Sequence, residues 1–215
     1  MFDSFDLLDS LLRYLALLIT ILGCAIVYAY FAYRYAQDCV DINSVSGIDG
    51  KLSFNPVRYF DPIGSGLFPL IVILLQSPIM FGWSKNVFVD YPRVISRHGL
   101  NSVILLESSG ILFHFFIAFL SSLFLDFSPR AEITQLLQYV ILFNIFFAFI
   151  KLCPILPYEG LRILSYLGLK FGNDVFARFY SFLAPYQLFV LLIVFFTPLN
   201  NLILYPAFFV MGFLL

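Results

Sequence analysis

Long apolar runs separated by short polar stretches dominate the hydrophobic pattern of this chain. They cover residues 11–36, 63–83, 103–125, 136–156 and 184–205. An α-helix needs about 20 apolar residues to cross a bilayer, and backbone polar groups in lipid must be hydrogen-bonded within the protein. The pattern therefore predicts an all-α integral membrane protein with about five transmembrane helices and a short sixth helix at 206–215.

The connections between the apolar runs are short, so we expect a single membrane domain over residues 1–215. One connection, at 38–61, contains turn-forming glycines and then alternates Leu52 and Phe54 before Asn55-Pro56. Alternation of this kind after a turn is typical of a short strand. We therefore expect a small extended segment after the first helix.

Composition supports a membrane setting and excludes one class of partner. Hydrophobic residues make up 61% of the chain and charged residues 12%, whereas soluble domains carry about 25% charged residues. The net charge is −1 and no basic block occurs, so lipid rather than nucleic acid is the expected surrounding. Asp3, Asp6 and Asp9 precede the first run, and a cleavable signal would carry basic residues there. We expect that run to be retained as a helix.

Polar residues inside or beside the runs are the candidates for chemistry, because ionisable groups in a membrane are costly. His114 lies in the middle of the third run, where it is either functional or a neutral imidazole bonded to a neighbouring helix. Glu159 lies in the turn C-P-I-L-P-Y-E-G-L-R at 153–162, where it could also cap the next helix. We expect Glu107 at the membrane interface and Lys151 at the edge of a run.

Three segments that follow the first run match, in order, motifs of one family of membrane enzymes. G-K-L-S-F-N-P at 50–56 is similar to the family motif G-R-L-T-L-N-P. Y-F-D-P-I-G at 59–64 is similar to H-I-D-P-I-G, and F-G-W-S-K-N-V-F-V at 81–89 is similar to F-G-W-A-K-P-V-P-V. The spacing between the three also matches, which makes coincidence an unsatisfactory explanation.

Two further motifs lie in the second half of the chain. Gly110 and His114 fall on the glycine and the asparagine of a G-x-x-x-N helix, and P-I-L-P-Y-E-G at 154–160 resembles P-I-P-P-L-D-G. Over about 23–200 the chain thus resembles the site-2 proteases, which are intramembrane zinc metalloproteases, and in particular their compact bacterial members. The resemblance implies a protease scaffold in the bacterial cytoplasmic membrane.

The family's chemistry depends on H-E-x-x-H in a transmembrane helix. Its histidines, at i and i+4, bind one zinc ion, and its glutamate activates water. Matching A-Y-F-A-Y-R at 29–34 to the family's A-Y-V-A-Y-K puts this motif at 24–28, which reads C-A-I-V-Y. The resemblance thus places Cys24 and Tyr28 at the two histidine positions and Ala25 at the general base. Glu159 stands at the aspartate that is the third ligand.

These replacements predict that the inherited hydrolysis does not operate and that the chain has no catalytic residue. Alanine cannot accept a proton, and general acid–base catalysis is typically worth about 10²–10⁴-fold. The phenol of Tyr28, with an ordinary pKa near 10, is a poor zinc ligand. We expect no resident cofactor, but a rearranged zinc site on Cys24, His114 and Glu159 is an alternative. Otherwise Cys24 and Tyr28 fill the former cavity, with His114 and Glu159 bonded to each other or to Tyr28.

Three functions remain open on this evidence. The first is an inactive protease homologue that binds a membrane-protein partner, with Leu52, Phe54 and Asn55 as the expected contact residues. The second is an accessory or structural subunit of a membrane complex, which the 28 phenylalanines would suit. The third is an active intramembrane metalloprotease with the unusual Cys/His/Glu site. A small transporter finds little support, because the runs show no inverted repeat.

Overall fold

Helices make up most of the part of the chain that the computed structural model describes, namely residues 6–36, 39, 54–75, 80–85, 87–128 and 130–215. Within these residues there is no strand, and four helical stretches are long and apolar enough to cross a membrane. These four are Leu7–Tyr35, Leu100–Leu123, Ala131–Leu152 and Val175–Val194. The prediction of an all-α integral membrane protein is confirmed.

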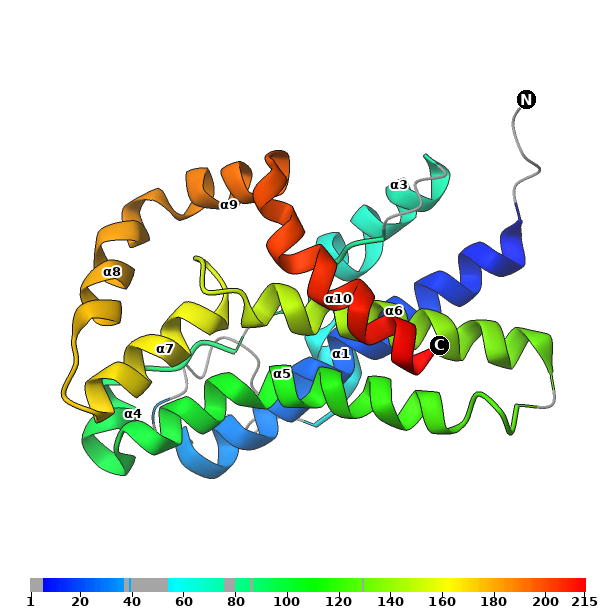
Figure 1. Ribbon diagram of the computed structural model, residues 1–215. Coiled ribbons are helices and arrows are strands. Elements are labelled where there is room, and N and C mark those ends of the chain that lie inside the picture. Colours follow the sequence, from blue (N-terminus) through cyan, green and yellow to red (C-terminus); the bar gives the residue numbers. More distant parts are fainter. Residues whose placement is uncertain (1–5, 37–38, 40–53, 76–79, 86, 129) are drawn as a thin grey trace.

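The helical elements follow one another along the chain as Figure 1 shows. Their bounds are α1 (Leu7–Ala36), η2 (Pro56–Tyr59), η3 (Pro62–Leu67), α3 (Phe68–Leu74), α4 (Tyr91–His98), α5 (Leu100–Leu123), α6 (Ala131–Leu152), α7 (Glu159–Lys170), α8 (Val175–Leu183), η4 (Ala184–Tyr186), α9 (Gln187–Phe196), η5 (Pro198–Asn200) and α10 (Asn201–Leu214).

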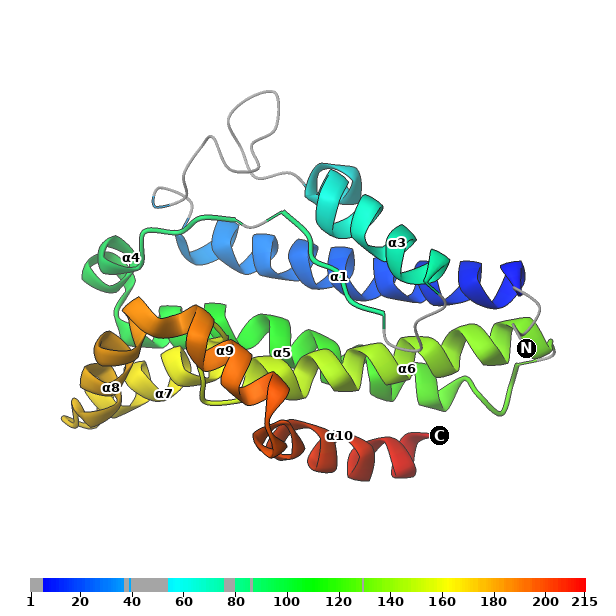
Figure 2. The same cartoon turned by 90° about the horizontal axis from the view of Figure 1, so that it is seen from above.

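Three long helices, α1, α5 and α6, pack against one another and form the centre of the fold. Figure 2 shows α5 and α6 between α1 on one side and α10 on the other. Small residues on α1 allow the close approach that membrane helices favour. A Cβ atom added to Gly23 would lie 2.5 Å from Cζ of Phe113 on α5. Leu17 and Ile21 of α1 share a buried cluster with Phe147 of α6.

The second predicted span, 63–83, is only partly helical. The helical part, Pro62–Leu74, would be about 20 Å long at 1.5 Å per residue, which is less than a bilayer core of about 30 Å. Beyond it, residues 80–85 are not helical and pass back beside η3, where Trp83 N–H donates to Gly64 O at 3.1 Å. Gly82 permits this approach, because a Cβ atom there would lie 2.7 Å from Gly64 O.

The fifth predicted span, 184–205, is interrupted. Helix α9 ends at Phe196 and α10 begins at Asn201. Between them the side chain of Thr197 accepts a hydrogen bond from Leu199 N–H, and Pro198 has no N–H to continue the helix. The apolar stretch that is long enough to cross is instead Val175–Val194, which comprises α8, η4 and most of α9.

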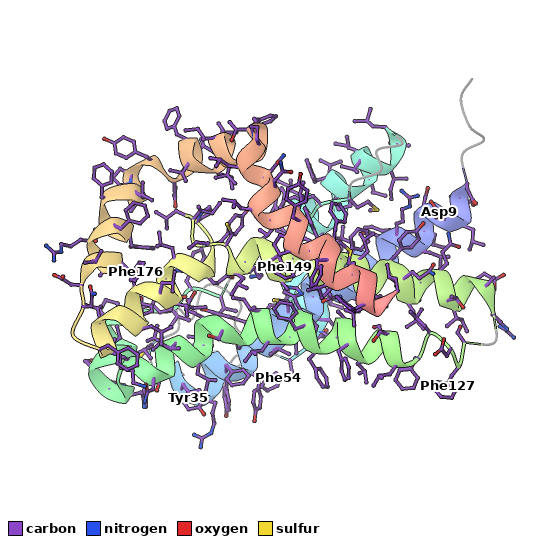
Figure 3. All side chains as sticks on the ribbon, in the orientation of Figure 1. Asp9, Tyr35, Phe54, Phe127, Phe149 and Phe176 are labelled. Carbon is purple, nitrogen blue, oxygen red and sulfur yellow. The ribbon has the colours of Figure 1, made fainter. Side chains whose placement is uncertain are left out.

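Part of the predicted extended segment after the first helix lies outside the described residues, including Leu52. Its last two positions are described and do not form a strand. Phe54 lies against the aromatic rings of Tyr30 and Tyr33 near the C-terminal end of α1, and Figure 3 labels it there beside Tyr35. Asn55 caps η2 by accepting from Val57 N–H at 3.0 Å.

Candidate functional site

A cavity of about 510 Å³ opens between α1, residues 81–85 and 87–89, α5, α6 and α7. Much of its lining is apolar, and the polar and ionisable side chains gather where α1, α5, α6 and α7 meet. Among these side chains are those of Cys24, Tyr28, Tyr91, His114, Lys151, Glu159 and Arg162. A few polar groups converging on an apolar cavity are typical of a binding site.

The cavity brings together the metal-site and general-base positions that the sequence predicted from three separate motifs. Cys24 and Tyr28, four residues apart on α1, both line it, as their shared helix face requires. His114 of α5 and Glu159 of α7 line it as well. Ala25 is buried beside them and packs with Ala29 and Tyr59. The interpretation that these positions form one centre is consistent with this placement.

Lys151 is the dominant cation of this centre, and sequence reasoning missed its role. Its ammonium, at the C-terminal end of α6, donates a hydrogen bond to Glu159 Oε1 in the first turn of α7. Burial alone would raise the pKa of Glu159, but the charge and the hydrogen bond of Lys151 bring that pKa below its ordinary value. The glutamate is therefore a paired carboxylate and not a free one.

The start of α7 is held against the end of α6 by a glycine. A Cβ atom added to Gly160 would lie 2.2 Å from Leu152 O and 2.6 Å from Cys153 O, so only glycine allows the two helices to meet so closely. This contact fixes Glu159 beside Lys151. The sequence pair Glu159-Gly160 is thus a structural unit as well as a family motif.

Lys151 and Cys24 lie on the same side of α5, next to Gly110. A Cβ atom built on Gly110 would be 3.1 Å from Cys24 Sγ and 3.8 Å from Lys151 Nζ. The absence of a side chain at Gly110 therefore leaves room for both the thiol and the ammonium. This gives a local reason for the glycine of the G-x-x-x-H helix.

A buried polar chain fixes the imidazole of His114. The side-chain amide of Asn144 donates to Val140 O at 2.8 Å and to Thr20 Oγ1 at 2.9 Å, so its oxygen is the atom that faces His114 Nδ1 at 2.8 Å. A carbonyl oxygen can only accept, which makes Nδ1 the protonated nitrogen. Nε2 is then a lone-pair acceptor, and it has no hydrogen-bond partner within the described residues.

A second buried ion pair adjoins the first. Glu107 of α5 is 1% exposed, and its Oε2 lies 3.1 Å from Nε of Arg162 on α7. Although these two atoms are close, they do not form a hydrogen bond with each other. The attraction between the carboxylate and the guanidinium is therefore that of their opposite charges. Burial alone would lower the pKa of Arg162, but Glu107 raises it above its ordinary value. Glu107, for which the sequence predicts a place at the membrane interface, is buried inside the fold with Arg162 as its partner.

Two phenols complete the centre. The Tyr28 and Tyr91 hydroxyl groups are 2.8 Å apart and share a hydrogen bond. The guanidinium of Arg162 lies over the Tyr91 ring at 5.7 Å, and burial raises the pKa of the Tyr91 phenol. Within the described residues His114 and Glu159 are bonded neither to Tyr28 nor to each other, so that expectation was wrong. The other expectation for His114, a bond to a neighbouring helix, is confirmed by its contact with α6. The partners of His114 and Glu159 are Asn144 and Lys151.

The segment at 81–85 presents an open backbone edge beside the cavity. Trp83 and Lys85 direct their N–H groups to Gly64 O and Tyr59 O, at 3.1 Å and 2.8 Å. In an extended segment successive residues point to opposite sides, so the backbone groups of Gly82 and Ser84 point away from η2 and η3. Within the described residues these groups have no hydrogen-bond partner, and both residues line the cavity.

The centre as it stands does not fit a zinc ion. Glu159 is engaged by the ammonium of Lys151, which would repel a second cation. Among the described residues no three His, Cys, Asp or Glu side chains are grouped closely enough to hold a metal. The two members with an unengaged donor atom are Cys24 and His114, and Tyr28 is committed to Tyr91.

The fold and the centre define an all-α integral membrane protein with an ion-paired cavity between its helices. Comparison adds one relative from Bacillus subtilis (strain 168), named "Putative zinc metalloprotease YwhC", which is 27% identical over 215 residues. The similarity spans 92% of this chain and 86% of the relative. No protein-family model matches the chain, and no solved structure matches it. The chain is thus a distant relative of a protein named as a zinc metalloprotease candidate, and its own long apolar helices support a membrane location.

Proposed function

We propose that the protein is a non-catalytic, site-2-protease-like protein of the bacterial cytoplasmic membrane that binds a membrane-protein partner in its cavity. The observation that carries the proposal is the Lys151–Glu159 pair, which stands where a protease of this kind would use a carboxylate on its metal. Ala25 at the general-base position supports it, because alanine cannot take a proton from water. The bacterial relative supports both the scaffold and the location.

The open backbone edge at Gly82 and Ser84 is the expected contact for the partner. An extended peptide that enters the cavity can pair its own backbone with these groups, as in strand addition to a sheet edge. Such pairing requires the partner's membrane segment to unwind locally. Phe54 and Asn55 are engaged with α1 and with η2, so we move the proposed contact from these residues to the edge at 82–84.

Photocrosslinking in cells tests this proposal. Phe88 lines the cavity and is exposed, so replacing it with p-benzoylphenylalanine places a probe there. Ser84→Pro removes the N–H of the edge, whereas the control Ser84→Ala keeps it. We expect a discrete adduct with one membrane protein that is lost in Ser84→Pro and retained in Ser84→Ala.

Two results would count against partner binding at the edge. One is an adduct pattern at position 88 that matches that of a probe at Phe213, an exposed residue of α10. The other is an adduct that Ser84→Pro leaves unchanged. Cleavage of membrane proteins by the purified protein would contradict the non-catalytic part separately.

A role as an accessory subunit is favoured by one other observation. The span Val175–Val194 is 6% buried within the chain, whereas each of the other three spans is 44% buried. Figure 1 shows α8 and α9 arching away from the central helices. If another subunit packs there, the protein extracted in a mild detergent should migrate in native electrophoresis as a hetero-complex, and a charged variant such as Phe182→Lys should release it.

A further inference from the structure

We infer that Lys151 is the resident cation of the centre: its ammonium takes the place of a metal ion beside Cys24, His114 and Glu159, and it excludes zinc. The inference goes beyond partner binding and does not depend on it. It concerns what stabilises the centre and which substitution separates this chain from a metal-binding one. Its test is therefore a metal measurement and not a binding or activity assay.

The first support is position. Lys151 Nζ donates to Glu159 Oε1, and it lies with Cys24 Sγ around the empty side of Gly110, at 3.8 Å and 3.1 Å from the point where a Cβ atom would be. His114 comes from the same helix as Gly110, one turn later, and lines the same cavity. The ammonium thus lies in the same cavity as the three side chains that could otherwise act as ligands, and with the ammonium in place these three are not grouped closely enough to hold a metal.

The second support is the state of His114. Asn144 accepts from Nδ1–H, and this leaves the lone pair of Nε2 unused in a side chain that is 1% exposed. A ring N–H held by an oxygen acceptor is the arrangement that orients metal-binding histidines. A buried acceptor without a partner is costly, and an approaching cation would relieve this cost. Lys151 donates its hydrogen bond to the carboxylate of Glu159, and the lone pair of His114 Nε2 has no partner within the described residues.

The third support is charge balance. The ion pairs of the centre contain two cations, Lys151 and Arg162, and two carboxylates, Glu107 and Glu159. Lys85 also lines the cavity, but it is exposed, so solvent screens its charge. A zinc ion added to the neutral set of ion pairs would leave an excess of two positive charges in a site enclosed by membrane helices, which is unfavourable. Removal of the Lys151 charge leaves an excess of one negative charge, and a thiolate on Cys24 would add another. A neutral residue at 151 therefore converts a cation-excluding centre into a cation-attracting one.

The zinc content of four purified proteins tests the inference: wild type, Lys151→Arg, Lys151→Met and Lys151→Gln. Each is incubated with zinc, desalted and analysed by inductively coupled plasma mass spectrometry. We expect equimolar zinc in the Met and Gln variants and none in wild type or Lys151→Arg, which keeps the charge. Zinc should raise the Tm of Lys151→Met by about 5 °C or more and leave that of wild type unchanged.

Ligand assignment is tested in the Lys151→Met background. Adding Cys24→Ser or Glu159→Gln should abolish the bound zinc, whereas adding Cys153→Ser, a cysteine that does not line the cavity, should not. Lys151→Gln keeps an amide that can hydrogen-bond Glu159, so this variant retains the fold if Lys151→Met does not. Zinc in wild type, zinc in neither neutral variant, or zinc that persists without Cys24 would each overturn the inference.

Discussion

Two polar clusters connect helices in this protein, one at the N-terminal end of α1 and one around the cavity. In the first, Asp9 pairs with Arg13 at 2.8 Å and accepts hydrogen bonds from Gln135 and Tyr139 of α6. All four side chains find partners within the cluster, and Figure 3 shows Asp9 at the end of the helix. The cavity cluster also joins helices by ion pairs. Some of its polar groups, however, have no hydrogen-bond partner within the described residues, namely His114 Nε2 and the backbone groups of Gly82 and Ser84.

The difference separates a structural contact from a site. At the end of α1, the charges are partly exposed, at 30% for Arg13 and 19% for Asp9, and water can replace a lost partner. At the cavity, Glu107 has no such alternative, because its side chain is 0% exposed. Loss of the partner of Glu107 should therefore cost much more than loss of a partner in the α1 cluster, and the unpaired groups at the cavity are available to a ligand.

The largest expected effect is that of Arg162→Ala, because it leaves Glu107 buried without its cation. Breaking a buried ion pair on one side typically costs about 3–5 kcal/mol. The matched control is Arg178→Ala, whose exposed pair with Asp174 lies on α8 and should contribute less than about 1 kcal/mol. Thermal unfolding in detergent measures both, and equal Tm shifts would contradict the comparison.

Next in size is Asn144→Leu, which removes the acceptor of His114 Nδ1–H inside the bundle. A buried donor left without a partner costs about 1–3 kcal/mol. The double variant His114→Phe/Asn144→Leu removes both partners, so it should be more stable than Asn144→Leu alone. A double variant that is less stable than either single variant would show that the pair is not the unit described.

A smaller effect is expected for Asp9→Ala at the end of α1. It removes one partly exposed ion pair and two hydrogen bonds, for which we expect a loss of about 1 kcal/mol. The adduct formed by the probe at position 88 should be unchanged, because no residue of this cluster lines the cavity. Loss of that adduct in a folded Asp9→Ala protein would mean that the two clusters are coupled.

The smallest effect is expected for Tyr91→Phe, which removes one hydroxyl group from the Tyr28–Tyr91 pair. A neutral hydrogen bond contributes about 0.5–1.5 kcal/mol, and the ring beneath Arg162 is retained. Tyr91→Ala removes the ring as well and should lower the Tm further. Equal Tm values for the two variants would rule out a contribution from the ring.

Sequence reasoning could predict the features that depend on length and local spacing. Three long apolar runs became α1, α5 and α6, because a hydrophobic segment long enough to span a bilayer has few other stable structures. The shared face of Cys24 and Tyr28 followed from helix geometry. The end of α3 at Leu74 and the end of α9 at Phe196 were missed, since hydropathy alone cannot show where a helix ends.

The polar partners could not be predicted in the same way. Lys151 was placed at the edge of a run, because sequence position does not show that the end of α6 faces Glu159 across a turn held by Gly160. Asn144 gave a signal that could have been used: it is the one amide between Tyr139 and Lys151 in an otherwise apolar helix. Asn144 and Lys151 are also seven residues apart on α6, which is about two helical turns and places them on one face of the helix.

The most direct test of the account is the mass of the partner crosslinked to a probe at position 88. Because the cavity is proposed to hold an extended membrane segment without cutting it, the account predicts that the adduct contains the full-length partner in wild-type protein. The same mass should be found in Glu159→Ala. A partner truncated within its membrane segment in wild type, but intact in Glu159→Ala, would contradict the non-catalytic function and restore an active protease.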